Sequence, residues 1–282
     1  MDMRTITFLT IKKNLVNGLK ERMGKTSFDL IDVDKVKCVG CGRCVKDCPA
    51  GCLFIENGKA EIRKTICIDC GHCYAICPTG AVTMKEHSVL EENVVSPSVI
   101  ESNSLLAFMK SRRSVRQFTK ETIEAEKIEM ILEAGRYSPT AANAQDVSYI
   151  VLGARQQELE RECVRIFRFW KKLLTPFVSI VRNIEVTDDF FFKGAPLVVV
   201  VTSKAPINAG LASSYMELMA TSLELGVLYS GFFVICAKHS RKIRKILALD
   251  KGKKVVSCLV IGRTVVKYQR IPPRKKISVK TL

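Results

Sequence analysis

The pattern of hydrophobic and polar positions divides the chain into two parts with different organisation. From residue 105 onward, apolar residues recur at helical spacing in the stretches 105–111, 122–138, 158–174, 209–228 and 240–249. Short apolar runs between them predict strands at residues 147–152, 196–203 and 255–262. The last two thirds of the chain should therefore form a domain in which helices and strands alternate. The glycine-rich fingerprint of dinucleotide-binding folds is absent from it.

The first third of the chain contains a repeated cysteine pattern instead. In the run from Cys38 to Pro49, two, two and three residues separate four cysteines, and proline follows the last; the run from Cys67 to Pro78 repeats this spacing. Between the runs, Asn57-Gly58 predicts the turn of a short hairpin. Cys52 fits no position of the repeat, and we interpret it as a core thiol.

Paired cysteines separated by two residues also occur in zinc sites, which are the alternative interpretation. A zinc site explains neither the third cysteine of each run nor the terminal proline, whereas the iron-sulfur run of bacterial ferredoxins explains both. Residues 30–86 thus resemble the two-cluster bacterial ferredoxins. The resemblance implies two [4Fe-4S] clusters, with ligands from both runs: Cys38, Cys41, Cys44 and Cys77 for one, and Cys67, Cys70, Cys73 and Cys48 for the other. Such clusters transfer single electrons, so this part should supply or drain a second redox centre.

The charge balance narrows the possible partners. The chain has 45 lysines and arginines against 28 acidic residues, a formal net charge of +17. A basic surface favours phosphorylated cofactors, acidic redox proteins or nucleic acid. No nucleic-acid-binding motif is present, so we do not expect nucleic acid as a partner. No apolar run reaches about 18 residues, and charges interrupt the N-terminal stretch early, so we expect a cytoplasmic protein without a membrane span or signal peptide.

Three polar segments of the second part are candidates for a binding site. Guanidinium groups match phosphate oxygens, so the first segment could hold a phosphate with Arg112, Arg113, Ser114 and Arg116. A solvated basic surface is the alternative for this segment. The loop 138–145 offers the amides of Asn143 and Gln145 to a heterocycle. Arg274 and Lys275, near the C-terminus, form a second possible anion contact.

These three segments, together with residues 190–201, 225–233 and 261–276, resemble the nitroreductase family of flavoproteins. The resemblance covers about residues 105–276 and implies an α+β fold, with a mixed sheet flanked by helices, that works as a homodimer with FMN at the subunit interface. By this resemblance, the residues that match the contacts to the FMN phosphate and ribityl chain are Arg112, Arg113, Ser114 and Arg116. Asn143 matches the loop residue that faces the isoalloxazine. The other matching positions are Ser230 and Gly231 near the reactive side of the flavin, and Arg274, with Lys275, at the phosphate.

The resemblance leaves some points open. The helix expected from Ala209 to Leu228 would form the dimer core, or equally a core helix within one chain. The family commonly has proline and tryptophan where this chain has Asp146 and Val147, which puts the loop and the pocket shape in doubt. The predicted domains are an N-terminal extension (1–29), a ferredoxin-like domain (30–86), a connector (87–104) and a nitroreductase-like domain (105–282).

The function expected from this organisation is that of an oxidoreductase. Electrons would pass from the clusters to FMN and on to a small acceptor, nitroaromatic or quinone-like, with NAD(P)H as an alternative donor and an acidic redox protein as a candidate donor. No catalytic triad is expected, because His72, His87 and His239 have no nucleophile partner and Cys163, Cys236 and Cys258 lie in apolar patterns. The alternatives are a non-catalytic electron carrier or redox sensor, with residues 168–181 covering the flavin, and the dehalogenating or ring-fragmenting branches of the family.

Overall fold

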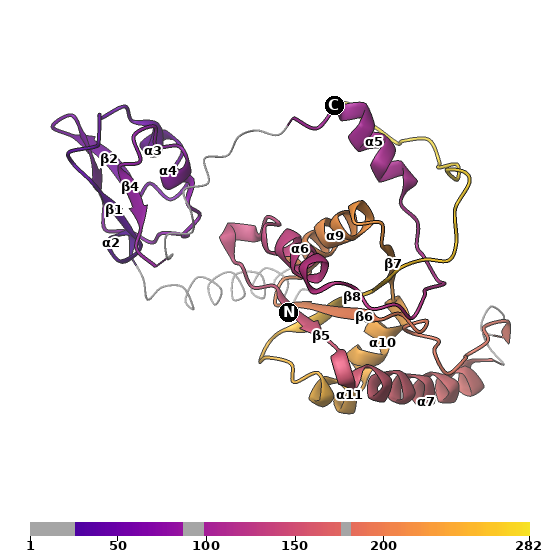
Figure 1. The fold of residues 1–282 in the computed structure, drawn as a ribbon. Coiled ribbons are helices and arrows are strands. Elements are labelled where there is room, and N and C mark those ends of the chain that lie inside the picture. Colours follow the sequence, from indigo (N-terminus) through magenta and orange to yellow (C-terminus); the bar gives the residue numbers. More distant parts are fainter. Residues whose placement is uncertain (1–25, 87–98, 176–181) are drawn as a thin grey trace. The chain divides into compact units, whose positions relative to one another are not determined.

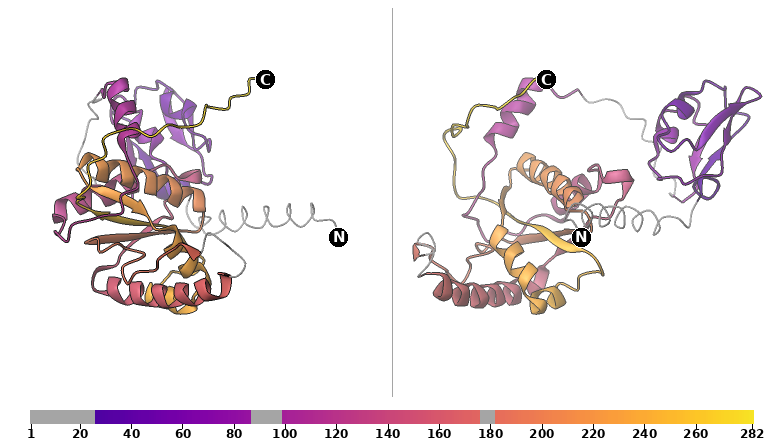
Figure 2. Two further views of the ribbon diagram at one scale, coloured as in Figure 1. Left: turned by 90° about the vertical axis from the view of Figure 1, so that its right-hand side faces the viewer. Right: turned by 180° about the vertical axis from the view of Figure 1, so that it is seen from behind.

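The computed structural model describes residues 26–86, 99–175 and 182–282 (Figures 1 and 2). These residues form two compact units, and the short segment 142–144 groups with the first. Residues 1–25 of the expected N-terminal extension, most of the expected connector with His87, and residues 176–181 of the expected flavin cover lie outside the described residues. In the described part of the chain, no helix is long and apolar enough to cross a membrane.

The first unit is small and built from short elements. Its helices are α2 (Ser27–Leu30), α3 (Arg43–Lys46) and α4 (His72–Ala75), and its strands are β1 (Ile31–Val33), β2 (Leu53–Glu56), β3 (Lys59–Ile62) and β4 (Val82–Met84). β1 pairs with β4 and β2 with β3, both antiparallel.

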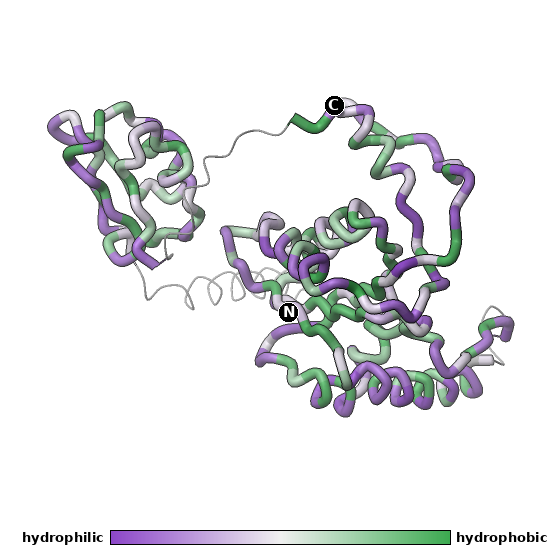
Figure 3. Tube along the Cα trace, viewed as in Figure 1, coloured by the Kyte–Doolittle hydropathy of each residue, from purple (hydrophilic) through white to green (hydrophobic). Residues whose placement is uncertain are grey.

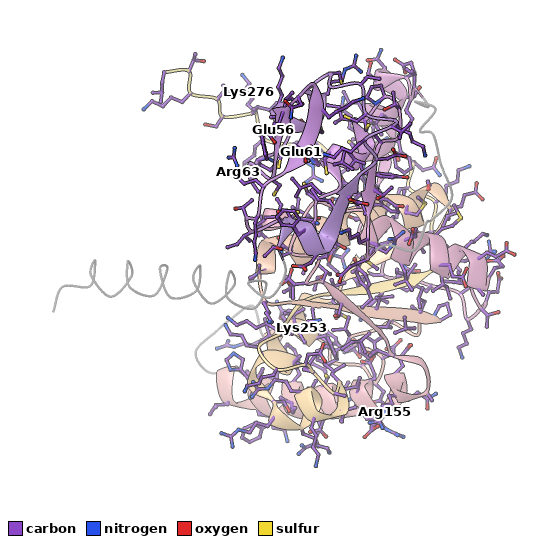
Figure 4. All side chains as sticks on the ribbon, turned by 90° about the vertical axis from the view of Figure 1, so that its left-hand side faces the viewer. Glu56, Glu61, Arg63, Arg155, Lys253 and Lys276 are labelled. Atoms are coloured by element: carbon purple, nitrogen blue, oxygen red, sulfur yellow. The ribbon has the colours of Figure 1, made fainter. Side chains whose placement is uncertain are left out.

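The β2–β3 hairpin confirms the turn expected at Asn57-Gly58. Both residues have positive φ, 48° and 73°, as a tight two-residue hairpin turn requires. On the flanking strands, Glu61 pairs with Lys35 at 2.6 Å, and the guanidinium of Arg63 lies 5.5 Å from the centre of the Phe54 ring; Figure 4 labels Glu61 and Arg63.

The second unit contains a four-stranded sheet in the order β5-β6-β8-β7. The strands are β5 (Ser148–Val151), β6 (Leu197–Ser203), β7 (Gly226–Tyr229) and β8 (Lys254–Gly262), and neighbours are antiparallel. An isolated parallel bridge between Ser114 and Val227 lies at the outer side of β7, which agrees with the mixed sheet that the resemblance implied. All seven residues of β6 are buried, which identifies it as a central strand covered on both faces.

Helices cover both faces of this sheet (Figure 1). One face carries α6 (Ala125–Arg136) and α9 (Pro206–Ser222); the other carries α7 (Gln156–Leu174), α10 (Gly231–His239) and α11 (Arg241–Ile246). Val198 and Val200 of β6 pack toward the α7 side, and Leu197, Val199 and Val201 toward the α9 side. The two cores thus use alternate positions of one strand, and Figure 3 shows this strand as a hydrophobic stretch.

The remaining helices of the second unit are short or peripheral. α5 (Ser102–Ser111) has no buried residue, and two 3-10 turns, η1 (Ala141–Asn143) and η2 (Gly153–Arg155), flank β5.

The helix predicted from Ala209 to Leu228 is wrong at its C-terminal end. α9 ends at Ser222, Glu224 adopts a left-handed φ of 61°, and residues 226–229 form β7. The helix and the strand both contain buried apolar residues, and the polar residues between them resemble those within α9, so hydrophobicity alone could not place the boundary. α10 was not predicted either, because only Ser230 separates it from β7.

Candidate functional site

The eight predicted cluster ligands line two separate hollows in the first unit. One hollow is lined by Cys38, Cys41, Cys44 and Cys77. The other is lined by Cys48, Cys67, Cys70 and Cys73. Each hollow thus combines three cysteines of one run with the fourth cysteine of the other run, which is the grouping implied by the ferredoxin resemblance.

Equivalent glycines precede the two short helices, each of which carries the third cysteine of its run. Gly42 and Gly71 are the N-caps of α3 and α4, with left-handed φ of 70° and 72°, which glycine adopts without steric cost. Gly40 serves a different purpose, because a Cβ there would overlap the carbonyl oxygen of Gly58. The loop around the first hollow therefore needs glycine to pass the β2–β3 turn.

Backbone N–H groups point at the sulfur atoms in both repeats. The amide of Cys52 donates to Cys48 Sγ at 3.2 Å, and the amide of Ala81 donates to Cys77 Sγ at 3.2 Å, the same four-residue relation in each run. The amide of Ala60 donates to Cys38 Sγ at 3.3 Å. Such N–H donors stabilise thiolates and tune iron-sulfur centres.

The thiols of the hollows differ in how easily they lose a proton. Burial raises the pKa of Cys73 to about 12. Burial also acts on Cys77, but the amides of Thr79 and Ala81 outweigh it and lower the pKa of that thiol. A buried thiolate such as that of Cys73 needs a compensating cation, which an iron-sulfur cluster provides. The donor set therefore fits such a cluster in each hollow. In the described residues, no three cysteine, histidine or acidic side chains are arranged around a single metal ion.

Two residues near the hollows have roles outside the predicted ligand set. Cys52 is buried, as expected, and its thiol lies 3.8 Å from the carbonyl oxygen of Ile66, yet it also lines the second hollow. His72 lies on the surface, where its Nδ1 is 3.1 Å from a carboxylate oxygen of Asp47.

In the second unit, the arginine-rich segment runs beside β7. Ser114 pairs with Val227 in parallel, and the amide of Val115 donates to the carbonyl of Val227 at 3.0 Å. Gly226 permits this approach, because a Cβ there would lie 2.7 Å from a methyl group of Val115. Because the two segments are parallel, their C-terminal ends lie at the same end of the pairing, where residues 230 and 231 follow β7. The structure therefore brings two of the predicted binding segments to one edge of the sheet.

The start of α10 lies at the end of β7 and provides N–H donors. Ser230 is the N-cap and Gly231 the first helical residue; the Ser230 amide donates to Cys258 at 2.8 Å, and its side chain makes no capping hydrogen bond. The first amides of a helix have no partner within the helix, and they carry partial positive charge. This helix start suits a negatively charged group.

A buried carboxylate holds Arg112 in place. Arg112 donates to Glu217 of α9 at 2.6 Å, and Glu217 is only 6% exposed. The Tyr229 hydroxyl donates to the carbonyl of Ser213 on the same helix at 2.9 Å. Burial and the neighbouring Glu217 raise the pKa of Tyr229 well above its ordinary value. The role of Glu217 was not predicted, because its contact with Arg112 joins residues that are distant in sequence.

The other arginines of the segment contact backbone carbonyl groups. Arg113 donates to Lys110 at 2.8 Å and to Arg270 at 3.4 Å. Arg116 is exposed and donates to the carbonyl of Ser114 at 3.2 Å. Arg112 and Arg113 are thus held by neighbouring groups, whereas Arg116 remains accessible to solvent.

The remaining predicted residues have other surroundings. Asn143 groups with the first unit, where its amide donates to the carbonyl oxygens of Ile68 at 3.2 Å and Asp69 at 2.6 Å. Arg274 and Lys275 lie in an exposed C-terminal segment without regular structure. Within the described residues, the site at the β7 edge therefore consists of the segments 112–116 and 230–231.

The loop that contains Asn143 is strained. Ala142, Asn143 and Gln145 all have left-handed backbone conformations, with φ of 50°, 52° and 44°. Residues other than glycine rarely adopt this region, and they do so mainly where the surrounding structure enforces it.

Asp146, which departs from the family pattern, has a clear structural role. Its carboxylate accepts hydrogen bonds from two side chains, the Ser203 hydroxyl at 2.6 Å and the side-chain amide of Asn208 at 2.7 Å. It also accepts from the backbone amides of Lys204 at 2.9 Å and Ala205 at 3.2 Å. Burial alone would raise the pKa of Asp146, but these donors outweigh it and lower the pKa. Asp146 thus joins β5 to the beginning of α9, where Asn208 in turn accepts from the amide of Ala141 at 3.0 Å.

Comparisons with known proteins agree with this division into two units. Residues 109–263 match the model of the nitroreductase family, and residues 37–82 match that of a 4Fe-4S dicluster domain. No curated protein matches the chain.

Solved structures of similar fold include nitroreductases. A Desulfitobacterium hafniense nitroreductase with bound FMN has 22% identity and a TM-score of 0.54, and a Bacteroides fragilis nitroreductase with bound FMN has 21% and 0.52. In both comparisons the match covers 64% of this chain and 100% of the other. The family model spans more than half of the 282 residues. The chain therefore belongs to the nitroreductase family, and a ferredoxin-like 4Fe-4S domain precedes its nitroreductase domain.

Proposed function

We propose that the protein is an FMN-dependent oxidoreductase in which two [4Fe-4S] clusters and the flavin share electrons for the reduction of a small acceptor. The observation that carries the proposal is the division of eight cysteines between two hollows in one unit and the β7-edge anion site in the other. Nitroaromatic and quinone-like compounds are the proposed acceptors. The proposed donors are NAD(P)H or an acidic redox protein.

FMN would lie at the β7 edge. Arg112, Arg113, Ser114 and Arg116 would hold its phosphate and ribityl chain, and Ser230 and Gly231 would lie near its reactive side. When bound, FMN supplies the exchange between single electrons and hydride. The protein contributes binding, charge and orientation: Glu217 fixes Arg112, and the amides at the start of α10 favour negative charge. The proposed remaining contacts are Asn143, Arg274 and Lys275.

A homodimer is part of the proposal. α5 has no buried residue although it presents Leu105, Leu106 and Met109, and the C-terminal segment exposes Ile277 by 88% and Val279 by 77%. A second copy of the chain would cover such apolar side chains. Arg274 and Lys275 could then contact a flavin phosphate of either subunit. Light scattering of the purified protein measures this directly.

Anaerobic purification with quantification of iron, sulfide and flavin tests the proposal. About eight irons and one FMN per chain are expected for two four-iron clusters and one flavin. Zinc in place of iron would refute the assignment of the first unit. Turnover of a nitroaromatic or quinone distinguishes the enzyme from a non-catalytic electron carrier, which would load the same cofactors without reducing small acceptors.

The phosphate contact has its own test. Arg116→Ala removes an exposed guanidinium from the site, and we expect FMN binding to weaken about 10- to 100-fold, as for the loss of one charged hydrogen bond. Riboflavin, which lacks the phosphate, should bind both forms equally. Lys120→Ala, an exposed basic residue of the same segment, is the matched control. An equal loss for FMN and riboflavin would contradict a phosphate role for Arg116.

A further inference from the structure

The helices α7 and α11 carry many basic side chains on one side of the second unit. At intervals of three or four residues, one stripe along α7 consists of Arg161, Arg165, Arg168 and Lys172. α11 lies beside α7 (Figures 1 and 2) and adds Arg241, Lys242, Arg244 and Lys245. We call these eight side chains the basic face.

Acidic neighbours neutralise only part of the basic face. Glu162 is buried and joins the two helices, because it accepts from Arg165 at 2.6 Å and from Lys242 at 2.8 Å. Arg168 pairs with Asp188 at 2.8 Å. The other five members form no ion pair with any residue that the structure describes; they are Arg161, Lys172, Arg241, Arg244 and Lys245. The face therefore retains a positive excess on a rigid pair of helices.

The stripe of α7 borders a hollow of the surface. The hollow has a volume of about 380 Å³ and is lined mainly by the four basic residues of α7, with Phe169, Val164 and Asp188. Phe169 is 67% exposed. A concave, basic surface with one exposed aromatic ring fits a projecting acidic segment of a protein. A flat anionic bilayer fits it less well, because among the described side chains of α7 only Phe169 and Leu173 are exposed, large and apolar.

Aromatic rings connect this surface with the start of α10. Phe167 precedes Arg168 on α7, and its ring centre lies 5.0 Å from that of Phe232 and 5.3 Å from that of Phe190. Phe232 directly follows Gly231, which belongs to the proposed flavin site. Two rings in contact thus join the residue next to Arg168 of the basic face to the residue next to Gly231.

We propose that the basic face docks an acidic one-electron carrier protein, which delivers electrons to the flavin site through this side of the molecule. The inference rests on the proposed function and identifies the donor of that site. Each docked carrier is oxidised by one electron, so two successive dockings supply the two electrons of one flavin reduction, with the accompanying proton taken from solvent. Electrostatic attraction between complementary faces raises the rate of encounter and makes it sensitive to salt.

Charge reversal on the exposed, unpaired members tests the proposal. The probe is a purified acidic bacterial ferredoxin, and the variant is Arg161→Glu with Lys172→Glu in the full-length holoenzyme. We expect its association rate with the ferredoxin to fall about tenfold or more at low ionic strength. The difference should disappear near 1 M salt, where the Debye length is about 3 Å. Calorimetry of the oxidised proteins provides a measurement of binding that does not depend on turnover.

The matched control is Lys120→Glu with Lys251→Glu, which reverses two exposed lysines outside the basic face. Equal losses in both double variants, or no loss in the first, would overturn the proposal. A third outcome would also overturn the proposal. In it, the wild type binds anionic vesicles, the changes at Arg161 and Lys172 abolish this binding, and association with the ferredoxin does not change. FMN content and reduction by dithionite are measured first in every variant, so that failure of the flavin site is distinguished from failure of the docking face.

Discussion

Replacement of Asp146 tests how the loop before β5 is fixed to α9. The carboxylate accepts four hydrogen bonds, and two of the donors, Ser203 and Asn208, belong to residues that are fully buried. In Asp146→Ala, the backbone amides of Lys204 and Ala205 can be hydrated, and the Ser203 hydroxyl keeps the carbonyl of Ala205 as an acceptor at 2.8 Å. The side-chain amide of Asn208 loses its acceptor inside the protein. An unsatisfied buried polar group costs about 1–3 kcal/mol, so we expect a loss of about 2 kcal/mol.

Asp146→Asn is a sharper test, because it changes one atom. The orientation of Asn208 is fixed, since its Oδ1 accepts from the amide of Ala141 and its Nδ2 must then face residue 146. An asparagine at 146 that keeps its oxygen toward Ser203 directs an NH₂ group at the NH₂ group of Asn208. We expect this variant to lose about 2 kcal/mol, the order of one unsatisfied charged hydrogen bond.

The exchange Asp146→Asn with Asn208→Asp restores the match of donor and acceptor. The new carboxylate at position 208 accepts from the Ala141 amide and from the new side-chain amide at position 146, so the double variant should recover most of the stability that either single change loses. Chemical denaturation at pH 7 measures the coupling, expected at about 2 kcal/mol. In thermal melts, 1 kcal/mol corresponds to about 2–4 °C for a domain of this size. Additive losses in the double variant would refute the reasoning from the orientation of Asn208.

Three further predictions address other parts of the molecule. Burial raises the pKa of Glu160 to about 7, although the amides of Phe191 and Phe192 donate to its carboxylate and oppose this rise. The folded state binds this proton more tightly than the unfolded state, so the protonated carboxyl contributes about 3 kcal/mol to the free energy of unfolding below about pH 4.5, and this contribution is lost as the pH rises through about 7. In Glu160→Gln, the free energy of unfolding from chemical denaturation should no longer fall for this reason between pH 5 and 8. An unchanged pH dependence would contradict the prediction. Gly226→Ala should destabilise the second unit by about 1–3 kcal/mol through overpacking against Val115, and adding Val115→Ala should recover part of the loss in the same assay, whereas no recovery would place the strain elsewhere. Cys73→Ala should lower iron from about eight to about four per chain with unchanged FMN, and complete loss of iron would indicate that the two hollows do not fill independently.

Local patterns in the sequence predicted most of the fold. The Asn57-Gly58 turn depends on the backbone freedom of two adjacent residues. The strand β6 is a short apolar run because both of its faces are buried. Each of these features is therefore encoded within a few positions of the sequence. The boundary between α9 and β7 was not predictable in this way. Between the two buried segments, Glu224 is an exposed charged residue, but a single glutamate also occurs within α9 at Glu217, so it does not mark the end of the helix. A left-handed Glu224 ends the helix where glycine is the usual sign.

The candidate site was predictable to a similar extent. The grouping of the cysteines followed from the resemblance to ferredoxins, and the structure places those eight residues around two hollows. The partners of Arg112 and Asp146 could not be predicted, because Glu217 and Asn208 belong to another element far along the chain, and only the packing of α9 on the sheet brings them into contact.

The helix α9 determines the spacing between the two parts of the chain that it holds. Asn208 near its beginning fixes the loop around Ala141 and Asp146, and Glu217, nine residues later, fixes Arg112. At 1.5 Å per residue, these anchors are about 13 Å apart along the axis, a distance that a rigid helix keeps constant. Lengthening either loop would leave this distance unchanged. One residue inserted between the anchors would turn Glu217 by about 100° and advance it by about 1.5 Å, which would release Arg112 from its carboxylate.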